Sequence, residues 1–118
     1  MIRSLGFLGV RTDAFAATTA LYRFAPLGYL AAFFDTIEIN SPFYRIPPPT
    51  HSKSWTRRVS SNPDFKFTTK IFRGFTHEKA QPTAEDVKAF RDYLDPLRDA
   101  GRLGAVLLQY PWSFKNSP

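Results

Sequence analysis

The chain of 118 residues is long enough for one modest domain, and its 43% hydrophobic content favours a packed core over a disordered tail. The sequence has no cysteine, which excludes disulfides, thiolate zinc sites and cysteine nucleophiles and fits a cytoplasmic location; no apolar run approaches the roughly 18 residues of a membrane span. The formal net charge is +6, which favours partners that carry negative charge.

The first 25 residues carry weaker patterns than the rest of the chain. Residues 5–10 are compatible with a short strand and residues 14–24 with a helix. Proline suits the first turn of a helix, and apolar residues recur from Pro26 to Phe34. This pattern predicts a helix that leads into the first clear strand.

Two of the clear strands alternate apolar and polar residues. Residues 36–40 alternate strictly and are closed by a Ser-Pro pair, and residues 65–71 alternate after an Asn-Pro-Asp turn. Between them, residues 50–60 are predicted to form a short helix with Trp55 and Val59 on one face.

A long helix is predicted to begin after Thr83, a favourable N-cap residue. Glu85 and Asp86 follow in the first turn, where the helix dipole favours negative charge. Pro96 is expected to kink or divide this helix, and Gly101 is expected to end it. The helix would present an apolar stripe of helical period, made of Val87, Phe90, Leu94 and Leu97.

Residues 105–110 are almost continuously apolar, which predicts a strand buried on both faces, as in parallel sheets covered by helices. Helix and strand therefore alternate from residue 26 to residue 110. This order predicts an α/β fold with about four parallel strands and flanking helices, in a single domain over residues 1–118.

The three clear strands all end in a polar residue: Asn40, Lys70 and Gln109. Because the carboxyl ends of parallel strands meet at one edge of a sheet, we expect these side chains to lie close together, and the period of two adds Glu38 to the same face. The four residues predict a pocket for a small polar or anionic ligand. The alternative is that Glu38 and Lys70 form a buried ion pair, while Asn40 and Gln109 satisfy loop backbone.

These residue types suit either catalysis or simple binding, so the sequence leaves open whether the protein is an enzyme. Glu38 is a candidate general base, Lys70 a candidate nucleophile or anion clamp, and His77 a candidate proton shuttle. Asn40 and Gln109 would orient the ligand. The two histidines are far apart and no phosphate-binding glycine loop is present, so neither a metal site nor a cofactor is predicted.

Four stretches of the chain resemble the YecE-like family, known as domain of unknown function 72. They are residues 34–41 with Phe43-Tyr44-Arg45, residues 65–67 with Lys70, Thr76-His77-Glu78, and residues 107–111 with Ser113-Phe114. The resemblance covers roughly residues 27–114 and implies a TIM-barrel-like (β/α) fold of about twice this length. Carried over by position, it implies that the family's pocket is lined here by Glu38, Asn40, Tyr44, Lys70, Thr76, His77 and Gln109.

The chain ends just after the fourth expected strand, so we expect a truncated half-barrel that does not close. An unclosed sheet exposes an edge and an apolar face. A second hypothesis is therefore a non-catalytic fragment that self-associates or pairs with a complementary half-barrel. Family members usually open with a Gly-Thr/Ser-x-Gly-Trp pattern, which residues 6–10 do not match, so the resemblance implies that residues 1–25 are a divergent N-terminal segment.

Residues 41–82 carry the charge imbalance, with eight basic residues against two acidic ones. The difference, 8 − 2, equals the whole net charge of +6. A local positive field attracts phosphates, acidic substrates or nucleic acid, so nucleic-acid binding by residues 45–79 is a third hypothesis. The alternative is a solvated basic region, because the basic residues are scattered and no nucleic-acid motif is present.

Overall fold

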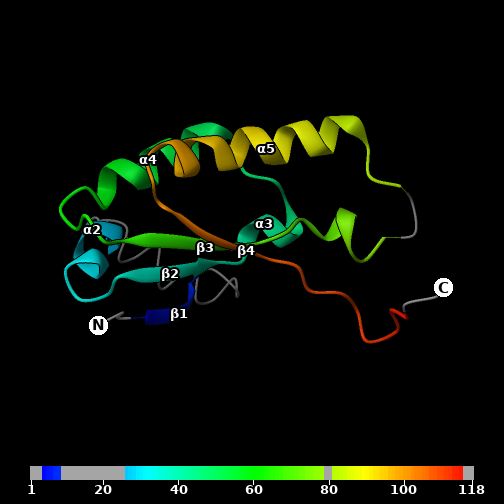
Figure 1. Cartoon of the computed structure of the whole chain (residues 1–118), viewed down its shortest axis with the longest axis horizontal. Coiled ribbons are helices and arrows are strands. Elements are labelled where there is room, and N and C mark those ends of the chain that lie inside the picture. Colours follow the sequence, from blue (N-terminus) through cyan, green and yellow to red (C-terminus); the bar gives the residue numbers. More distant parts are fainter. Residues whose placement is uncertain (1–3, 9–25, 79–80, 116–118) are drawn as a thin grey trace.

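The computed structural model of the chain describes residues 4–8, 26–78 and 81–115. Four strands form one parallel sheet in the order β1 (Ser4–Leu8), β2 (Thr36–Ile39), β3 (Lys66–Lys70) and β4 (Leu103–Leu107). The helices are α2 (Pro26–Ala31), α3 (Ser41–Tyr44), α4 (Pro49–Arg58), the 3-10 helix η1 (Arg73–Phe75) and α5 (Ala84–Asp99). α4 and α5 pack side by side over one face of the sheet (Figure 1). The α/β class, the four parallel strands and the unclosed sheet are therefore confirmed.

The pairing of the central strands decides which side chains face the helices. β2 and β3 pair without a register shift, with Ile39 opposite Thr69. The side chains of Ile37, Ile39, Phe67 and Thr69 are buried, whereas the alternate residues of both strands are partly or fully exposed. The predicted phase is confirmed, and Glu38 belongs to the face that points away from the helices.

The core lies between this sheet face and the two long helices. Tyr93 of α5 is fully buried, with its hydroxyl 3.1 Å from Thr69 Oγ1 and its ring edge-on to Trp55 of α4 at a centroid distance of 6.1 Å. Burial raises the pKa of the Tyr93 hydroxyl well above its usual range, because water no longer stabilises the phenolate. Phe90 and Leu97 extend this contact along α5.

The apolar stripe of α5 is rotated relative to its prediction. Phe90 and Leu97 are buried as expected, but Val87 is exposed and Tyr93 takes its place in the core. The buried residues follow the spacing 3 and 4, so the centre of the buried face lies at Tyr93. The predicted N-cap is confirmed: the backbone N–H of Asp86 donates to Thr83 Oγ1 at 3.0 Å.

Pro96 does not divide α5, which is one continuous helix from Ala84 to Asp99. The residue lies in the C-terminal part of the helix, where its missing N–H removes one intrahelical hydrogen bond, the bond to the carbonyl of Asp92. Gly101 ends the segment as predicted, with a positive φ of 68° that glycine adopts without strain.

β4 differs most from its prediction. It spans Leu103–Leu107 instead of residues 105–110, because β3 ends at Lys70, which lies opposite Leu107. The prediction of burial on both faces is also wrong, since Ala105 and Leu107 are exposed. β4 is at the edge of the described sheet, and α4 and α5 cover one face of that sheet (Figure 1).

Asn62 joins the turns that precede β2 and β3. Its Nδ2 donates hydrogen bonds to the carbonyls of Ala31 at 2.8 Å and Phe34 at 3.2 Å, and to Asp35 Oδ1 at 3.0 Å. These bonds tie the starts of both strands together. The unshifted register of β2 and β3 places their carboxyl ends level as well.

β1 overlaps the strand predicted near the N-terminus, whereas the helix predicted over residues 14–24 lies outside the described residues. Within the described ranges, no helix has the length and apolarity needed to cross a membrane. The single domain over residues 1–118 and the cytoplasmic location stay predictions.

Candidate functional site at the carboxyl edge of the sheet

The carboxyl ends of β2, β3 and β4 meet at one edge of the sheet. Lys70 is the last residue of β3 and lies opposite Leu107 of β4, and Asn40 follows directly after β2. The register of β2 and β3, continued by one residue, places Asn40 level with Lys70. Gln109 follows the end of β4 by two residues. The three residues that end the predicted strands therefore lie at the same edge of one parallel sheet, as expected.

Asn40 is buried at this edge without hydrogen bonds from its side chain. It leaves the strand with a helical backbone (φ −102°, ψ −20°) and is the N-cap of α3, but its side chain makes no cap hydrogen bond. The residue is 1% exposed, and neither Oδ1 nor Nδ2 has a partner in the described part of the chain. Within the described part of the chain, the Asn40 side chain therefore makes no hydrogen bond to loop backbone. A buried amide without hydrogen bonds lowers the stability of the fold by about 1–3 kcal/mol, and a ligand that forms those hydrogen bonds would restore it.

Glu38 adds a buried carboxylate oxygen to the same region. It lies in β2 opposite Thr68 and is partly buried. Its Oε1 is buried and has no hydrogen-bond partner among the described residues. A carboxylate oxygen only accepts hydrogen bonds, so a ligand would have to offer it an O–H or N–H group. The same unshared lone pair is what a general base requires.

Phe43 connects two of the predicted residues, although the sequence analysis gave it no site role. Lys70 Nζ lies over its ring, 5.7 Å from the centroid, and the His77 ring is edge-on to it at a centroid distance of 5.0 Å. α3 positions Phe43 here because Pro42 suits the first turn of a helix and starts α3 directly after β2. The sequence shows an aromatic residue behind the Ser-Pro pair that closes the strand, but it does not show the contacts of that residue with Lys70 and His77.

η1 positions Thr76 and His77 in the loop after β3. Thr76 is buried, and its Oγ1 lies 2.7 Å from His77 Nδ1. The backbone N–H of His77 donates to the carbonyl of Arg73 at 2.7 Å, and Arg73 forms an ion pair with Glu78 at 3.5 Å. The contact at Nδ1 orients the exposed imidazole and directs ligand or solvent contacts to Nε2.

Tyr44 and Gln109 lie farther out. Tyr44 is exposed, and its ring is edge-on to Phe43 with centroids 5.0 Å apart. Gln109 is exposed beyond the end of β4, and within the described residues no contact joins it to the other predicted site residues. The structure thus gathers Lys70, His77, Thr76 and Tyr44 around Phe43, beside Asn40 and Glu38, and leaves Gln109 at the rim.

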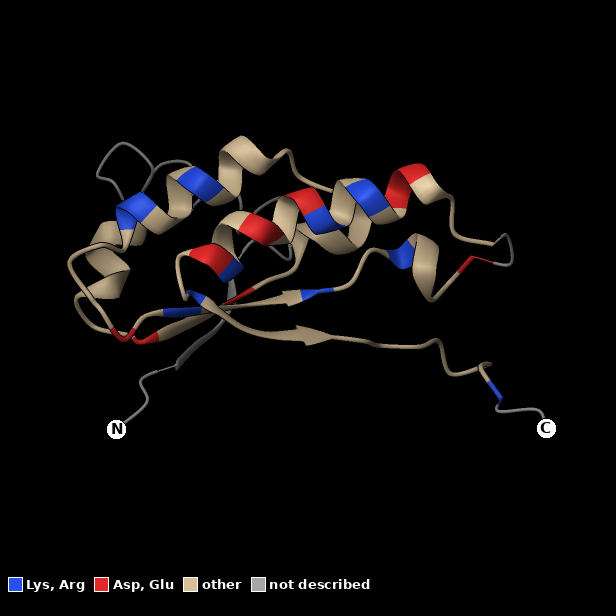
Figure 2. Ribbon diagram, turned by 45° about the horizontal axis from the view of Figure 1, so that its top comes forward, with Lys and Arg blue, Asp and Glu red and all other residues tan. Residues whose placement is uncertain are grey.

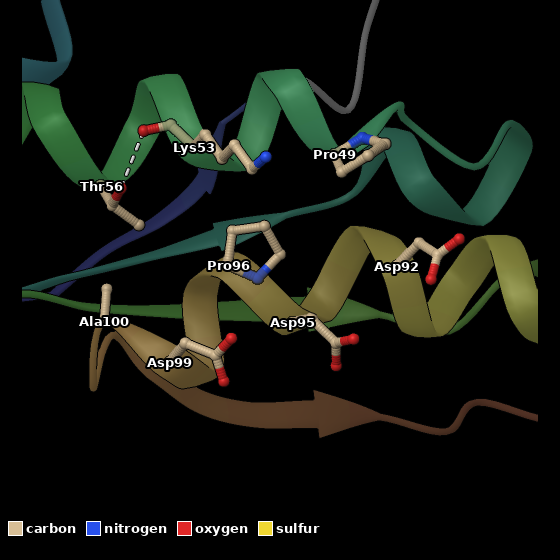
Figure 3. Close-up of a pocket in the computed structure, with 8 residues that line it drawn as sticks. All are labelled: Pro49, Lys53, Thr56, Asp92, Asp95, Pro96, Asp99 and Ala100. Atoms are coloured by element: carbon tan, nitrogen blue, oxygen red, sulfur yellow. Dashed lines mark hydrogen bonds between the residues drawn. The ribbon is translucent and has the colours of Figure 1, made fainter.

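A separate groove of about 530 Å³ runs between α4 and α5 (Figure 3). Its carboxylates already form ion pairs with neighbouring basic side chains: Asp92 lies 2.7 Å from Lys88, and Asp95 and Asp99 each lie 3.2 Å from Arg98. The groove therefore has few unmet polar groups, in contrast to the carboxyl edge. None of the predicted site residues belongs to its lining, which consists of Pro49, Lys53, Thr56, Asp92, Asp95, Pro96, Asp99 and Ala100.

Six of the eight basic residues of the middle of the chain fall into two groups, and Lys66 lies apart at the start of β3. One group lies on α4, beside α5 with its five acidic residues (Figure 2). The other follows the strands at the carboxyl edge and comprises Arg45, Lys70 and Arg73. In the described part of the chain, no group of three or more histidine and acidic side chains could hold a metal ion. Nucleic-acid binding stays a prediction.

Comparison with known proteins relates this geometry to a family. A family model described as "Protein of unknown function DUF72" matches residues 13–118. The UPF0759 protein YunF of Bacillus subtilis (strain 168) is 27% identical, over 69% of this chain and 30% of that protein. Two crystal structures of a DUF72 family protein of Enterococcus faecalis V583 match 99% of this chain and 42% of their own, with TM-scores of 0.72 and 0.74 at 24% and 21% identity. The predicted resemblance and fold class are confirmed, and the chain spans less than half the length of these relatives.

Two buried asparagines, one without and one with side-chain hydrogen bonds, test whether the Asn40 amide contributes to stability. Asn40→Leu should leave the free energy of unfolding unchanged or raise it by up to about 2 kcal/mol, because it removes polar atoms that have no partner. Asn62→Leu should lower it by about 1–3 kcal/mol, because Asn62, which is 9% exposed, donates to backbone carbonyls. Urea unfolding followed by circular dichroism measures both. Equal losses in the two variants would contradict the assignment.

Proposed function

The chain belongs to the DUF72 family, whose function is unknown, and on that premise we propose that it binds a small polar or anionic ligand at the carboxyl edge of its sheet. The observation that carries the proposal is Asn40, a buried amide whose donor and acceptor atoms both lack partners among the described residues. Native proteins give most buried polar groups a hydrogen-bond partner, so a buried group without one requires an explanation. Ligand sites of parallel α/β folds lie at the carboxyl ends of strands, which is where Asn40 lies.

The neighbouring residues support the same proposal. Glu38 Oε1 is a second buried acceptor without a partner in the described chain, and Lys70 brings a positive charge to the level of Asn40. In a catalytic version of the site, Glu38 would take a proton and Lys70 would hold an anionic group or act as the nucleophile. His77 would exchange the proton with solvent, since its ring is exposed and oriented by Thr76.

A thermal-shift screen against a metabolite library tests this function. For any compound that raises the melting temperature, Lys70→Ala and Glu38→Gln should weaken binding by about tenfold or more, the effect of losing one charge-assisted hydrogen bond. Lys66→Ala is the matched control, because this exposed lysine is at the other end of β3. The proposal fails if a ligand binds both site variants as tightly as it binds the unchanged protein.

A second proposal concerns assembly. The surface formed by β4 and the segment after it exposes a series of large apolar side chains, here called the C-terminal apolar face: Leu107, Leu108, Tyr110, Trp112 and Phe114. Large exposed apolar side chains gathered in one segment favour contact with a partner when they form one surface. β4 is also an edge strand of the described sheet, and edge strands offer backbone groups for pairing with another chain.

We propose that a second copy of the chain covers this surface. Each copy contributes four parallel strands, and two copies make the eight strands at which (β/α) barrels close. Pairing of β4 in one copy with β1 in the other would satisfy both edges of both sheets. The ligand sites of the two copies would then lie at the same mouth.

Sedimentation velocity at micromolar concentration tests the assembly. The unchanged chain should sediment as a dimer, and Leu107→Asp should shift it to the monomer, because a charge at the interface opposes burial. Val87→Asp is the matched control. Val87 is about as exposed as Leu107 (43% against 44%) but lies on α5, away from the proposed interface, so this variant should remain a dimer. A stable monomer of the unchanged chain, with a cooperative melt, would overturn the assembly proposal.

A further inference from the structure

We propose that the ligand of the carboxyl-edge site is a small hydroxylated anion, a compound that carries several hydroxyl groups and one carboxylate or phosphate group. The inference rests on the ligand-binding function proposed above and adds the chemical class of the ligand. It is drawn from the polar atoms that Asn40, Glu38 and Lys70 bring to one edge of the sheet.

The hydroxyl groups follow from the unmet atoms of Asn40 and Glu38. Glu38 Oε1 and Asn40 Oδ1 need donors, and Asn40 Nδ2 needs an acceptor; all three are buried without partners among the described residues. A hydroxyl group both donates and accepts, so adjacent hydroxyls on one ligand meet all three requirements. A carboxylate or phosphate oxygen at Glu38 would instead place two negative charges together.

The anionic group follows from Lys70 and its surroundings. The face of the Phe43 ring attracts the Lys70 ammonium, whose Nζ is 5.7 Å from the ring centroid, and keeps it at the carboxyl edge. Arg45 also follows a strand at this edge, whereas Arg73 is already paired with Glu78. A neutral polyol would gain a hydrogen bond from the lysine but no ion pair, and a simple anion would not supply the donors that Glu38 and Asn40 require.

The spacing of the three residues fits one small molecule. Asn40 is level with Lys70 on the neighbouring strand, where backbones are about 5 Å apart. Glu38 precedes Asn40 by two residues, a distance of about 7 Å along an extended strand. A short carbon chain or a single sugar ring that carries a terminal anionic group reaches all three.

Isothermal titration calorimetry of the whole chain tests the ligand class. The probes are a panel of sugar phosphates and sugar acids, the corresponding neutral sugars, inorganic phosphate and acetate. We expect at least one hydroxylated anion to bind about tenfold or more tightly than its neutral sugar and than the simple anion, a factor typical of one charge-assisted hydrogen bond. The series that binds with the higher affinity, the sugar phosphates or the sugar acids, identifies the anionic group of the ligand.

Site variants assign each half of the ligand. Lys70→Gln should abolish the preference for the anion over its neutral sugar, and Asn40→Leu should reduce the affinity to that of the simple anion. Lys66→Gln, at the opposite end of β3, should change neither. Asn40→Leu is assessed only after its unfolding curve confirms a folded protein.

The outcomes separate this inference from the proposed function. If no hydroxylated anion binds but another library compound does, and its binding depends on Lys70 and Glu38, the ligand class is wrong and the binding site stands. Equal binding of a hydroxylated anion and its neutral sugar overturns the role of the charge. If no compound of any class binds, both proposals fail together.

Discussion

The parallel pairing of β2 with β3 is the constraint on which the rest of the structure depends. Because side chains alternate along a strand, a slip of one residue would move Ile37 and Phe67 to the opposite face and turn Glu38 toward the helices. Burial of each large apolar side chain stabilises the fold by about 1.5–3 kcal/mol, whereas a carboxylate under the helices would be strongly unfavourable. The core therefore fixes the register, and the register in turn determines that the polar side of the sheet carries the candidate site.

Two asparagines near the ends of these strands differ in whether their side-chain amides stabilise the fold. Asn62 uses its amide to join the turns before β2 and β3, so its polarity stabilises the fold. Asn40 is more deeply buried and makes no such bonds within the described chain. A leucine would suit the surroundings of Asn40 better on stability grounds alone. The amide is the observation from which the proposed ligand site is argued, and Lys70 and Glu38 are its neighbours at the same edge.

Patterns of local periodicity predicted most of the fold, since β2, β3, α4 and α5 each have an alternating or helical arrangement of apolar residues. The errors arose where a neighbour decides the outcome: β4 ends early because β3 offers it no further partner. For the site, strand ends predicted that Asn40 and Lys70 share one edge. The contact of Phe43 with Lys70 and His77 depends on how α3 and η1 fold back over the edge, and the sequence pattern contains no information about that approach.

The side-chain amide of Asn40 is the most direct reporter of the site, because its two N–H groups have no other partner among the described residues. Nitrogen–proton correlation spectra, recorded while a ligand of the site is added, follow this amide, and the spectrum of Asn40→Leu assigns it. We predict that the Asn40 side-chain signals shift and saturate with the ligand while those of Asn62 stay in place. Saturable binding that leaves the Asn40 side-chain signals unmoved would contradict the central claim.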